Sequence, residues 1–248
     1  MSSGFRSSVQ KPTLVDVARV RSGASASRSL ATLPSRIQTA IPLRTFSRAS
    51  SSSELSWHDV IPETRDLEGP TGMVHVIEVQ GGKILTGRAV LRHDAPGVRR
   101  LSVLERHGRG SKPANAYVVG FGDLDGAIAS SVGHDSHNLI VVGKDPADMR
   151  AALASLAEVG GGFAVVRGGA VLARLPLPLG GLMSLEEPAA IASSLEALRA
   201  ASRAIGCVLV EPFLQLAFLS LPVIPSLKLT DRGLMDVDAF QLIDVRAA

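Results

Sequence analysis

The sequence predicts a mixed α/β domain, in which a mixed β-sheet with one βαβ unit carries two main helices and no β/α-barrel is formed. Short runs rich in Val and Ile recur between residues 74 and 142, and such runs favour strands over helices. One helix, near residues 146–159, has clear signals at both ends and lies between two of these runs. With 46% apolar residues among 248, the chain can bury a substantial core.

The first part of the predicted sheet is a series of apolar runs separated by glycine and polar residues. Gly81 and Gly82 favour a tight turn between the first two runs, and a polar stretch over residues 106–115 separates the third from the fourth. Six strands are therefore expected, over residues 74–79, 84–91, 101–104, 116–121, 126–132 and 139–142.

The predicted helix near residues 146–159 has the clearest local signals. Asp145 is a good N-cap, and Pro146 follows it at the first helical position. Apolar residues then recur at helical spacing until three consecutive glycines, residues 160–162, end the helix. Residues 163–175 indicate a hairpin with its turn at two glycines. Because a helix of this length can return the chain over the sheet, we expect the strands before and after it to pair in parallel.

The last third of the chain gives weaker signals. A second helix is expected from about Glu186 to Gly206, and residues 213–221 are apolar on both sides, which fits a central strand or a short buried helix. Residues 234–243 form a last alternating segment. Cys207 is the one cysteine, so an internal disulfide is excluded and a buried thiol is expected.

Charge is distributed unevenly along the chain. Residues 1–53 contain eight Lys or Arg and one acid, whereas the remainder holds 18 basic and 22 acidic residues, a net charge of −4. We therefore divide the chain into a basic, Ser- and Arg-rich segment, residues 1–68, expected to be disordered or a remnant connector, and a folded domain, residues 69–248. Residues 1–53 also fit a mitochondrial transit peptide, and otherwise a cytoplasmic location is expected.

Composition argues against two classes of partner. The body of the chain has one Trp, one Tyr and no basic stretch interleaved with aromatic residues, so a nucleic-acid groove is not predicted. No segment reaches the roughly 20 apolar residues that a membrane-spanning helix needs, so no membrane association is predicted.

The densest polar cluster lies between two predicted strands, at residues 133–138. It contains the candidate residues His134, Asp135, Ser136, His137 and Asn138. Two imidazoles, a carboxylate, a hydroxyl and an amide at a strand end can bind a ligand, hold a metal or transfer a proton, and the residues alone leave these alternatives open. A structural zinc site needs more Cys or His at the usual spacings, and Ser136 lacks the Gly-x-Ser-x-Gly context of a nucleophile. Hydrogen bonding that shapes the turn is the plain structural alternative.

Three other motifs are better interpreted as structural. The glycines at 160–162 follow a helix and do not open one, so a phosphate cradle is not favoured. Residues 120–126 place two carboxylates in a glycine-rich turn but lack the terminal acidic ligand of a calcium loop. Residues 230–233 indicate another turn, with Lys228 expected to be solvated.

Taken together, these stretches resemble one family, the carboxy-terminal domain of bacterial adenine deaminases. The stretch at residues 126–143 reads GAIASSVGHDSHNLIVVG and resembles the signature of that domain. Supporting matches occur in order along the chain: VLERH at 103–107, GGG at 160–162, LPLP at 175–178, GLMS at 181–184, PF at 212–213, LPVIP at 221–225 and LKLTDRGL at 227–234.

The resemblance implies a hydrolase of cyclic amidines that acts in purine salvage and converts adenine and water into hypoxanthine and ammonia. Complete adenine deaminases are similar to other amidohydrolases, with a metal-binding β/α-barrel of about 250 residues that carries a His-x-His pair. This chain has no His-x-His and no room for that barrel beside the domain described above. We therefore expect no cofactor in this chain, and manganese or iron in the missing barrel.

Our interpretation is an adenine deaminase-like domain without its barrel, as a fragment, a split subunit or a degenerate copy. Its expected partners are a separate amidohydrolase barrel, adenine and further copies of itself. In that setting His134 or His137 would hydrogen-bond purine nitrogens or relay a proton, and Asp135 would fix the imidazole tautomer. Ser136 and Asn138 are candidate substrate contacts. The alternatives are a non-catalytic structural or oligomerisation module, and an independent hydrolase that uses the polar cluster itself.

Overall fold

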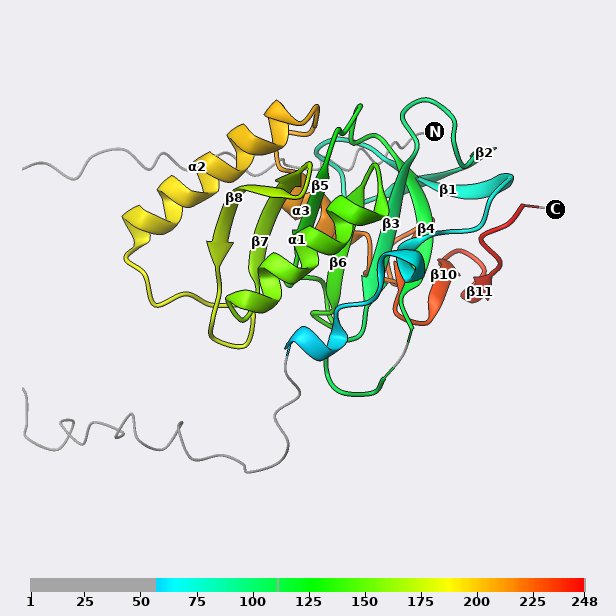
Figure 1. Cartoon of the computed structure of the whole chain (residues 1–248). Helices are drawn as coiled ribbons and strands as arrows, with labels where there is room; N and C mark the ends of the chain where they lie inside the picture. The colour runs from blue at the N-terminus through cyan, green and yellow to red at the C-terminus, as the bar shows by residue number, and fades with distance from the viewer. Residues whose placement is uncertain (1–56, 111, 248) are drawn as a thin grey trace, which may run out of the picture. The chain divides into compact units, whose positions relative to one another are not determined.

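The computed structural model describes residues 57–110 and 112–247, which are organised around an eight-stranded sheet (Figure 1). The predicted transit peptide lies outside these residues, as does most of the expected connector. The sheet contains β1 (Met73–Val79), β2 (Thr86–Arg92), β3 (Arg99–Leu104), β4 (Ala114–Val119), β5 (Ala127–Ser130), β6 (Leu139–Gly143), β7 (Gly162–Arg167) and β8 (Ala170–Pro176). A smaller sheet contains β9 (Leu227–Thr230), β10 (Gly233–Asp236) and β11 (Gln241–Ile243). The helices are η2 (Trp57–Val60), η3 (Thr64–Leu67), α1 (Pro146–Glu158), α2 (Pro188–Ala204) and α3 (Pro212–Phe218).

The strand order of the large sheet is β2-β1-β4-β3-β6-β5-β7-β8. β1 and β4 pair in parallel, and every other neighbouring pair in this sheet is antiparallel. The prediction of a mixed α/β fold on a mixed sheet without a closed barrel is therefore confirmed. Each of the six predicted strands between residues 74 and 142 has its counterpart in β1 to β6.

The expected parallel pairing across α1 is wrong in one respect. α1 does carry the chain from β6 to β7, but β5 lies between these two strands, with Ala127 opposite Gly143 on one side and Val166 on the other. The reason is that β5 and β6 already form a hairpin, so the free edge of β5 is the one that β7 reaches. The two strands run in the same direction without contacting each other.

The predicted signals at both ends of α1 are confirmed. Asp145 accepts hydrogen bonds from the main-chain N–H groups of Ala147 and Asp148, at 2.9 and 3.0 Å. At the other end Gly161 donates to the carbonyl of Leu156 at 2.8 Å and Gly160 to that of Ala157 at 3.3 Å, which is a Schellman ending. The glycine run therefore closes a helix, as the sequence predicts.

Helices and the small sheet cover the two faces of the large sheet. On one face α1 packs across β5, β6 and β7, and Leu67 of η3 is fully buried in the same cluster as Met149 of α1 (Figure 1). On the other face lie α2, α3 and the small sheet, which contribute Leu198, Leu216 and Leu229 to the larger core cluster. Of the two alternatives for residues 213–221, the short buried helix is confirmed as far as Phe218, where α3 ends. None of the helices described is long and apolar enough to span a membrane.

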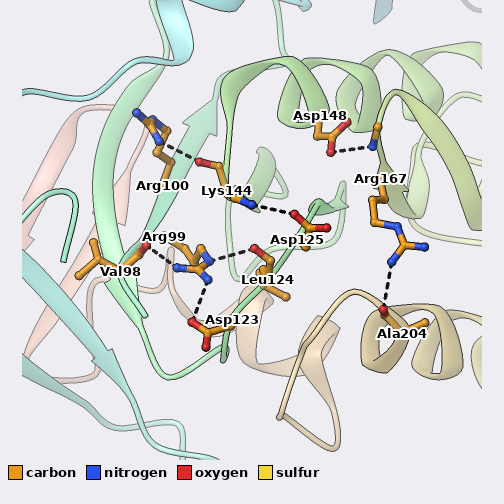
Figure 2. A network of polar contacts seen from close by, with 11 residues as sticks. Val98, Arg99, Arg100, Asp123, Leu124, Asp125, Lys144, Asp148, Arg167 and Ala204 are labelled. Atoms are coloured by element: carbon orange, nitrogen blue, oxygen red, sulfur yellow. Dashed lines mark hydrogen bonds and ion pairs between the residues drawn. The ribbon is translucent and has the colours of Figure 1, made fainter. Parts of the chain in front are cut away.

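A network of polar contacts fixes the end of the sheet where β5 begins and β6 ends (Figure 2). Lys144 pairs with Asp125 at 2.8 Å, and Arg99 pairs with Asp123 at 3.1 Å. Arg100 donates to the carbonyl oxygen of Lys144 at 2.8 Å. The two carboxylates considered as calcium ligands are therefore paired with cations, and the turn at residues 120–126 has a structural role.

The environment of Lys228 contradicts the sequence prediction. Lys228 was expected to be solvated, yet in β9 it has no exposed surface, and its Nζ donates to the carbonyl oxygen of Ile84 at 3.0 Å. Burial lowers the pKa of this ammonium to about 8. The local sequence shows a charged residue beside a turn and gives no sign that β2 and the small sheet enclose it.

Candidate functional site

The polar turn at residues 131–138 joins β5 to β6 at the end of the sheet away from the network of Figure 2. Buried Ser131 anchors it: the hydroxyl donates to the carbonyl oxygen of Gly181 at 2.6 Å and accepts from the N–H of Gly162 at 2.7 Å. The start of β7 and the loop after β8 therefore hold the base of the turn, and the polar residues beyond Ser131 project from a fixed support.

His134 lies on the side of the turn that faces α3. Its ring stacks on Phe218, with 4.7 Å between ring centroids and 28° between planes. Its main-chain N–H donates to the carbonyl oxygen of Ala217 at 3.2 Å, and its own carbonyl accepts from the hydroxyl of Ser220 at 3.3 Å. The imidazole is held in orientation, while 43% of the side chain stays exposed to meet a ligand.

Asp135 points into solvent, with 89% of its side chain exposed. Its nearer carboxylate oxygen is 3.9 Å from Nδ1 of His134, which is longer than a hydrogen bond. The predicted role of Asp135 in fixing the imidazole tautomer therefore has no hydrogen bond to support it in this conformation.

His137 has a constrained backbone and a partly buried ring. Its φ is +49°, in the left-handed region, and its N–H donates to the carbonyl oxygen of Gly133 at 2.9 Å. The main-chain carbonyl of His137 accepts from Nε of Arg106. Burial, followed by the positive charge of Arg106, lowers the pKa of the imidazole. The lowered pKa favours the neutral ring, and among the residues described the buried Nδ1 of His137 has no hydrogen-bond partner.

Ser136 and Asn138 lie on the side of the turn that lines a hollow of about 350 Å³. Ser136 is exposed, and its main-chain carbonyl lies 2.8 Å from Nε2 of His107. Asn138 is only 4% exposed, and its enclosed Oδ1 has no hydrogen-bond partner within residues 57–110 and 112–247. The other residues that line the hollow are Glu105, His107, Arg109, Asp231 and Arg232.

Several neighbours of the turn were missed by reasoning from the sequence. Glu105 is buried, and its carboxylate accepts from the main-chain N–H groups of His107 and Arg109, so it shapes the loop after β3. Arg106 bridges the turn to the carbonyl oxygen of Gly180, at 2.9 Å. The sequence does contain a sign of these residues, because acidic and basic residues directly follow the apolar strand that ends at residue 104. Arg232 carried no such signal, since it reaches the site through the separate small sheet.

The turn offers hydrogen-bonding groups, and its other two possible chemistries can be compared with the geometry. Among residues 57–110 and 112–247, no group of three or more His, Cys, Asp or Glu side chains could hold a metal ion. The hydroxyl of Ser136 makes no hydrogen bond to either imidazole in the part of the chain described, so a nucleophile–base pair is not formed.

Fold and site together define a mixed α/β domain that presents a rigid polar turn at one end of its sheet. The family model for the adenine deaminase C-terminal domain matches residues 75–241, and the chain belongs to this family. The adenine deaminase of Shewanella halifaxensis is 50% identical over 180 residues, which cover 71% of this chain and 31% of that protein. The adenine deaminase of Cereibacter sphaeroides is 46% identical over 195 residues, covering 75% and 34% respectively. Adenine deaminase 1 of Rhizobium meliloti is 50% identical over 182 residues, covering 69% and 32%.

The chain thus spans about a third of the length of the curated relatives that it matches. It is an adenine deaminase-like chain that corresponds to the carboxy-terminal part of those enzymes.

Proposed function

We propose that this chain serves adenine deamination, in which adenine and water give hypoxanthine and ammonia, as a carboxy-terminal domain that acts together with an amidohydrolase barrel. The observation that carries the proposal is the match to the C-terminal domain family over residues 75–241, at a third of the relatives' length. The barrel would supply the manganese or iron and the activated water. A cytoplasmic location and a role in purine salvage accompany this proposal.

The polar turn is the part of this chain that would meet the substrate. His134 is oriented by its stack on Phe218 and remains accessible, which supports a hydrogen bond to a purine nitrogen. Neutral His137 has a ring nitrogen without a partner, which supports an acceptor or proton-relay role. Neither residue requires a metal for these tasks.

A chimera tests the proposal directly. Residues 69–248 of this chain would replace the matching carboxy-terminal part of the Shewanella halifaxensis enzyme, and deamination would be followed by the absorbance change from adenine to hypoxanthine. We expect a rate within about tenfold of the parent. A chimera that folds and holds the parent's metal content but does not turn over adenine would overturn the proposal.

An activity assay of the chain alone, and then with a barrel protein, distinguishes a split enzyme from a structural module. Alone, with added manganese or iron, it should not deaminate adenine. Activity that appears when a separately expressed barrel protein is added would support the split enzyme. Stable binding to that barrel without any turnover would support the structural or oligomerisation module instead.

A further inference from the structure

The loop between β8 and α2, residues 177–187, presents large apolar side chains to solvent. Leu179, Met183 and Leu185 are 40%, 62% and 80% exposed. A single exposed apolar residue is ordinary in a folded protein, but three on one short loop form a patch of the kind that another protein surface covers. We refer to residues 177–187 as the apolar loop.

The fold holds the apolar loop firmly beside the polar turn. Nη2 of Arg106 donates to the carbonyl oxygen of Gly180 at 2.9 Å. The hydroxyl of Ser131 donates to the carbonyl oxygen of Gly181 at 2.6 Å. Because a loop fixed in this way loses little conformational freedom when it binds, its apolar side chains are preorganised for a partner. The apolar loop and the polar turn therefore form one continuous surface.

The segment that precedes β1 enters the domain at this same end of the large sheet. Residues 59–62 line a hollow of about 320 Å³ together with Leu104, the last residue of β3. Leu104 lies opposite Leu139, the first residue of β6, which follows the polar turn. In Figure 1 η2, drawn in cyan, and the yellow-green loop after β8 both lie toward the lower edge of the sheet.

The relatives indicate which partner covers this end of the domain. This chain matches about a third of the length of each relative, and the family model that begins at residue 75 describes a C-terminal domain. In those proteins the larger part precedes the domain and is joined to it through the segment before β1. A part joined there lies next to the polar turn and the apolar loop.

A second group of exposed apolar side chains lies at the opposite end of the sheet. Val210 is 80% exposed and Leu214 52% exposed, and both line a hollow before and along α3. The N–H of Val208 donates to the carbonyl oxygen of Phe121, just beyond the end of β4, at 3.0 Å. This group is remote from the segment before β1, so a partner joined through that segment leaves it uncovered.

We propose that the apolar loop is the surface through which this domain docks on the amidohydrolase barrel, with Met183 and Leu185 packed into an apolar depression of the barrel. The identity of the partner rests on the proposed function. The choice of surface rests on the exposure of the apolar side chains, the fixed backbone of the loop and the place where the chain enters the domain. Docking there brings the polar turn up to the barrel.

Thiol labelling tests the proposal at two matched positions. Leu185→Cys and Val210→Cys are introduced singly into the full chain and into the chimera, and labelled peptides are quantified by mass spectrometry. Both residues are 80% exposed, so the two thiols should react at similar rates in the chain alone. In the chimera the thiol at position 185 should react about tenfold more slowly, and the thiol at position 210 at an unchanged rate. Cys207 is a slow internal reference, because it is 5% exposed and burial raises its pKa.

An aspartate at the same two positions adds a functional measurement. Leu185→Asp should leave the Tm of the chain alone unchanged, because the side chain is exposed there. In the chimera it should lower the turnover of adenine about tenfold, because docking would bury the new carboxylate in an apolar depression. Val210→Asp should change neither the Tm nor the turnover.

The outcomes separate this proposal from the proposed function. Equal labelling of position 185 in the chain and the chimera, or full turnover by Leu185→Asp, would overturn the docking surface. Slower labelling at position 210 instead would overturn it and assign the barrel to the opposite end of the sheet. Slower labelling at position 185 in a chimera that does not turn over adenine would support the docking surface and reject the proposed function.

Discussion

At the scale of single residues, the polar turn divides its candidate side chains between two surfaces. His134 faces Phe218 of α3, whereas Ser136 and Asn138 face the hollow. Asp135 faces solvent and is 3.9 Å from the nearest imidazole nitrogen. These residues are consecutive in the sequence, but successive side chains of a turn point in different directions. The cluster is therefore two adjoining groups of side chains with different surroundings.

His137 gives a prediction on protonation and rate. Burial and the charge of Arg106 lower the pKa of its imidazole from the ordinary 6.5, so its ring should titrate below that value when followed by NMR. In the chimera described above, His137→Gln should lower kcat about 100-fold if the ring relays a proton. His93→Gln is the matched control, because His93 accepts from the N–H of Gly72 and is remote from the turn. Titration at or above 6.5, or an unchanged rate, would rule out the relay.

Lys228 gives a prediction on stability. Burial lowers its pKa from 10.5 to about 8, so between these values the unfolded chain binds a proton that the folded chain does not. The free energy of unfolding should therefore rise as pH increases from about 8 to about 10.5. Lys228→Met should abolish most of this rise, as measured by urea denaturation at several pH values.

Lys144 supplies the control for that measurement. It is exposed, and its pairing with Asp125 raises its pKa, the opposite direction to Lys228. Lys144→Met should leave the rise between pH 8 and pH 10 in place. A flat stability profile in the parent chain would show that Lys228 is not desolvated as the structure indicates.

At the scale of elements, the junction between α1 and β7 depends on Gly162. Its φ is +131°, and a Cβ built on it would lie 1.9 Å from the carbonyl oxygen of Leu175 in β8. Gly162→Ala should therefore destabilise the fold by about 2–4 kcal/mol, through backbone strain and displacement of the neighbouring strand. Thermal unfolding measures the effect.

Gly168→Ala is the control for the stability loss expected in Gly162→Ala. Gly168 also has a positive φ, +57°, but a Cβ there meets nothing within 4 Å. Gly168→Ala should cost about 1 kcal/mol, from the strained backbone alone. Similar losses for the two variants would show that crowding against β8 contributes little.

Elements with local signals could be predicted, and contacts between distant elements could not. Asp145 and the glycines after Val159 bound α1 in sequence and in structure, because capping depends on neighbouring residues. The position of β5 between β6 and β7 depends on which sheet edge is free when the chain returns, and no local pattern encodes this. The burial of Lys228 and the arrival of Arg232 at the hollow have the same origin, since both depend on where the small sheet packs.

At the scale of the whole molecule, the candidate site belongs to a chain that matches one part of its relatives. The chain matches a third of the relatives' length, and its described residues offer hydrogen-bonding groups without a metal-binding set. The resemblance to the C-terminal domain is confirmed by the family match, because the motifs of that domain are present in order. The features it did not anticipate, the hollow and the atoms without partners in the turn, arise from packing between β3, β6 and the small sheet.

The two ends of the β5–β6 hairpin differ in how freely their sequences can change. At the end drawn in Figure 2, Lys144 pairs with Asp125, so a substitution at either residue removes an ion pair that joins the two strand ends. At the other end Asn138 gives the fold no hydrogen bond through its amide oxygen. Replacement of the exposed side chains of Asp135 and Ser136 removes no such charge pair, which makes these two positions favourable for redesign by laboratory evolution.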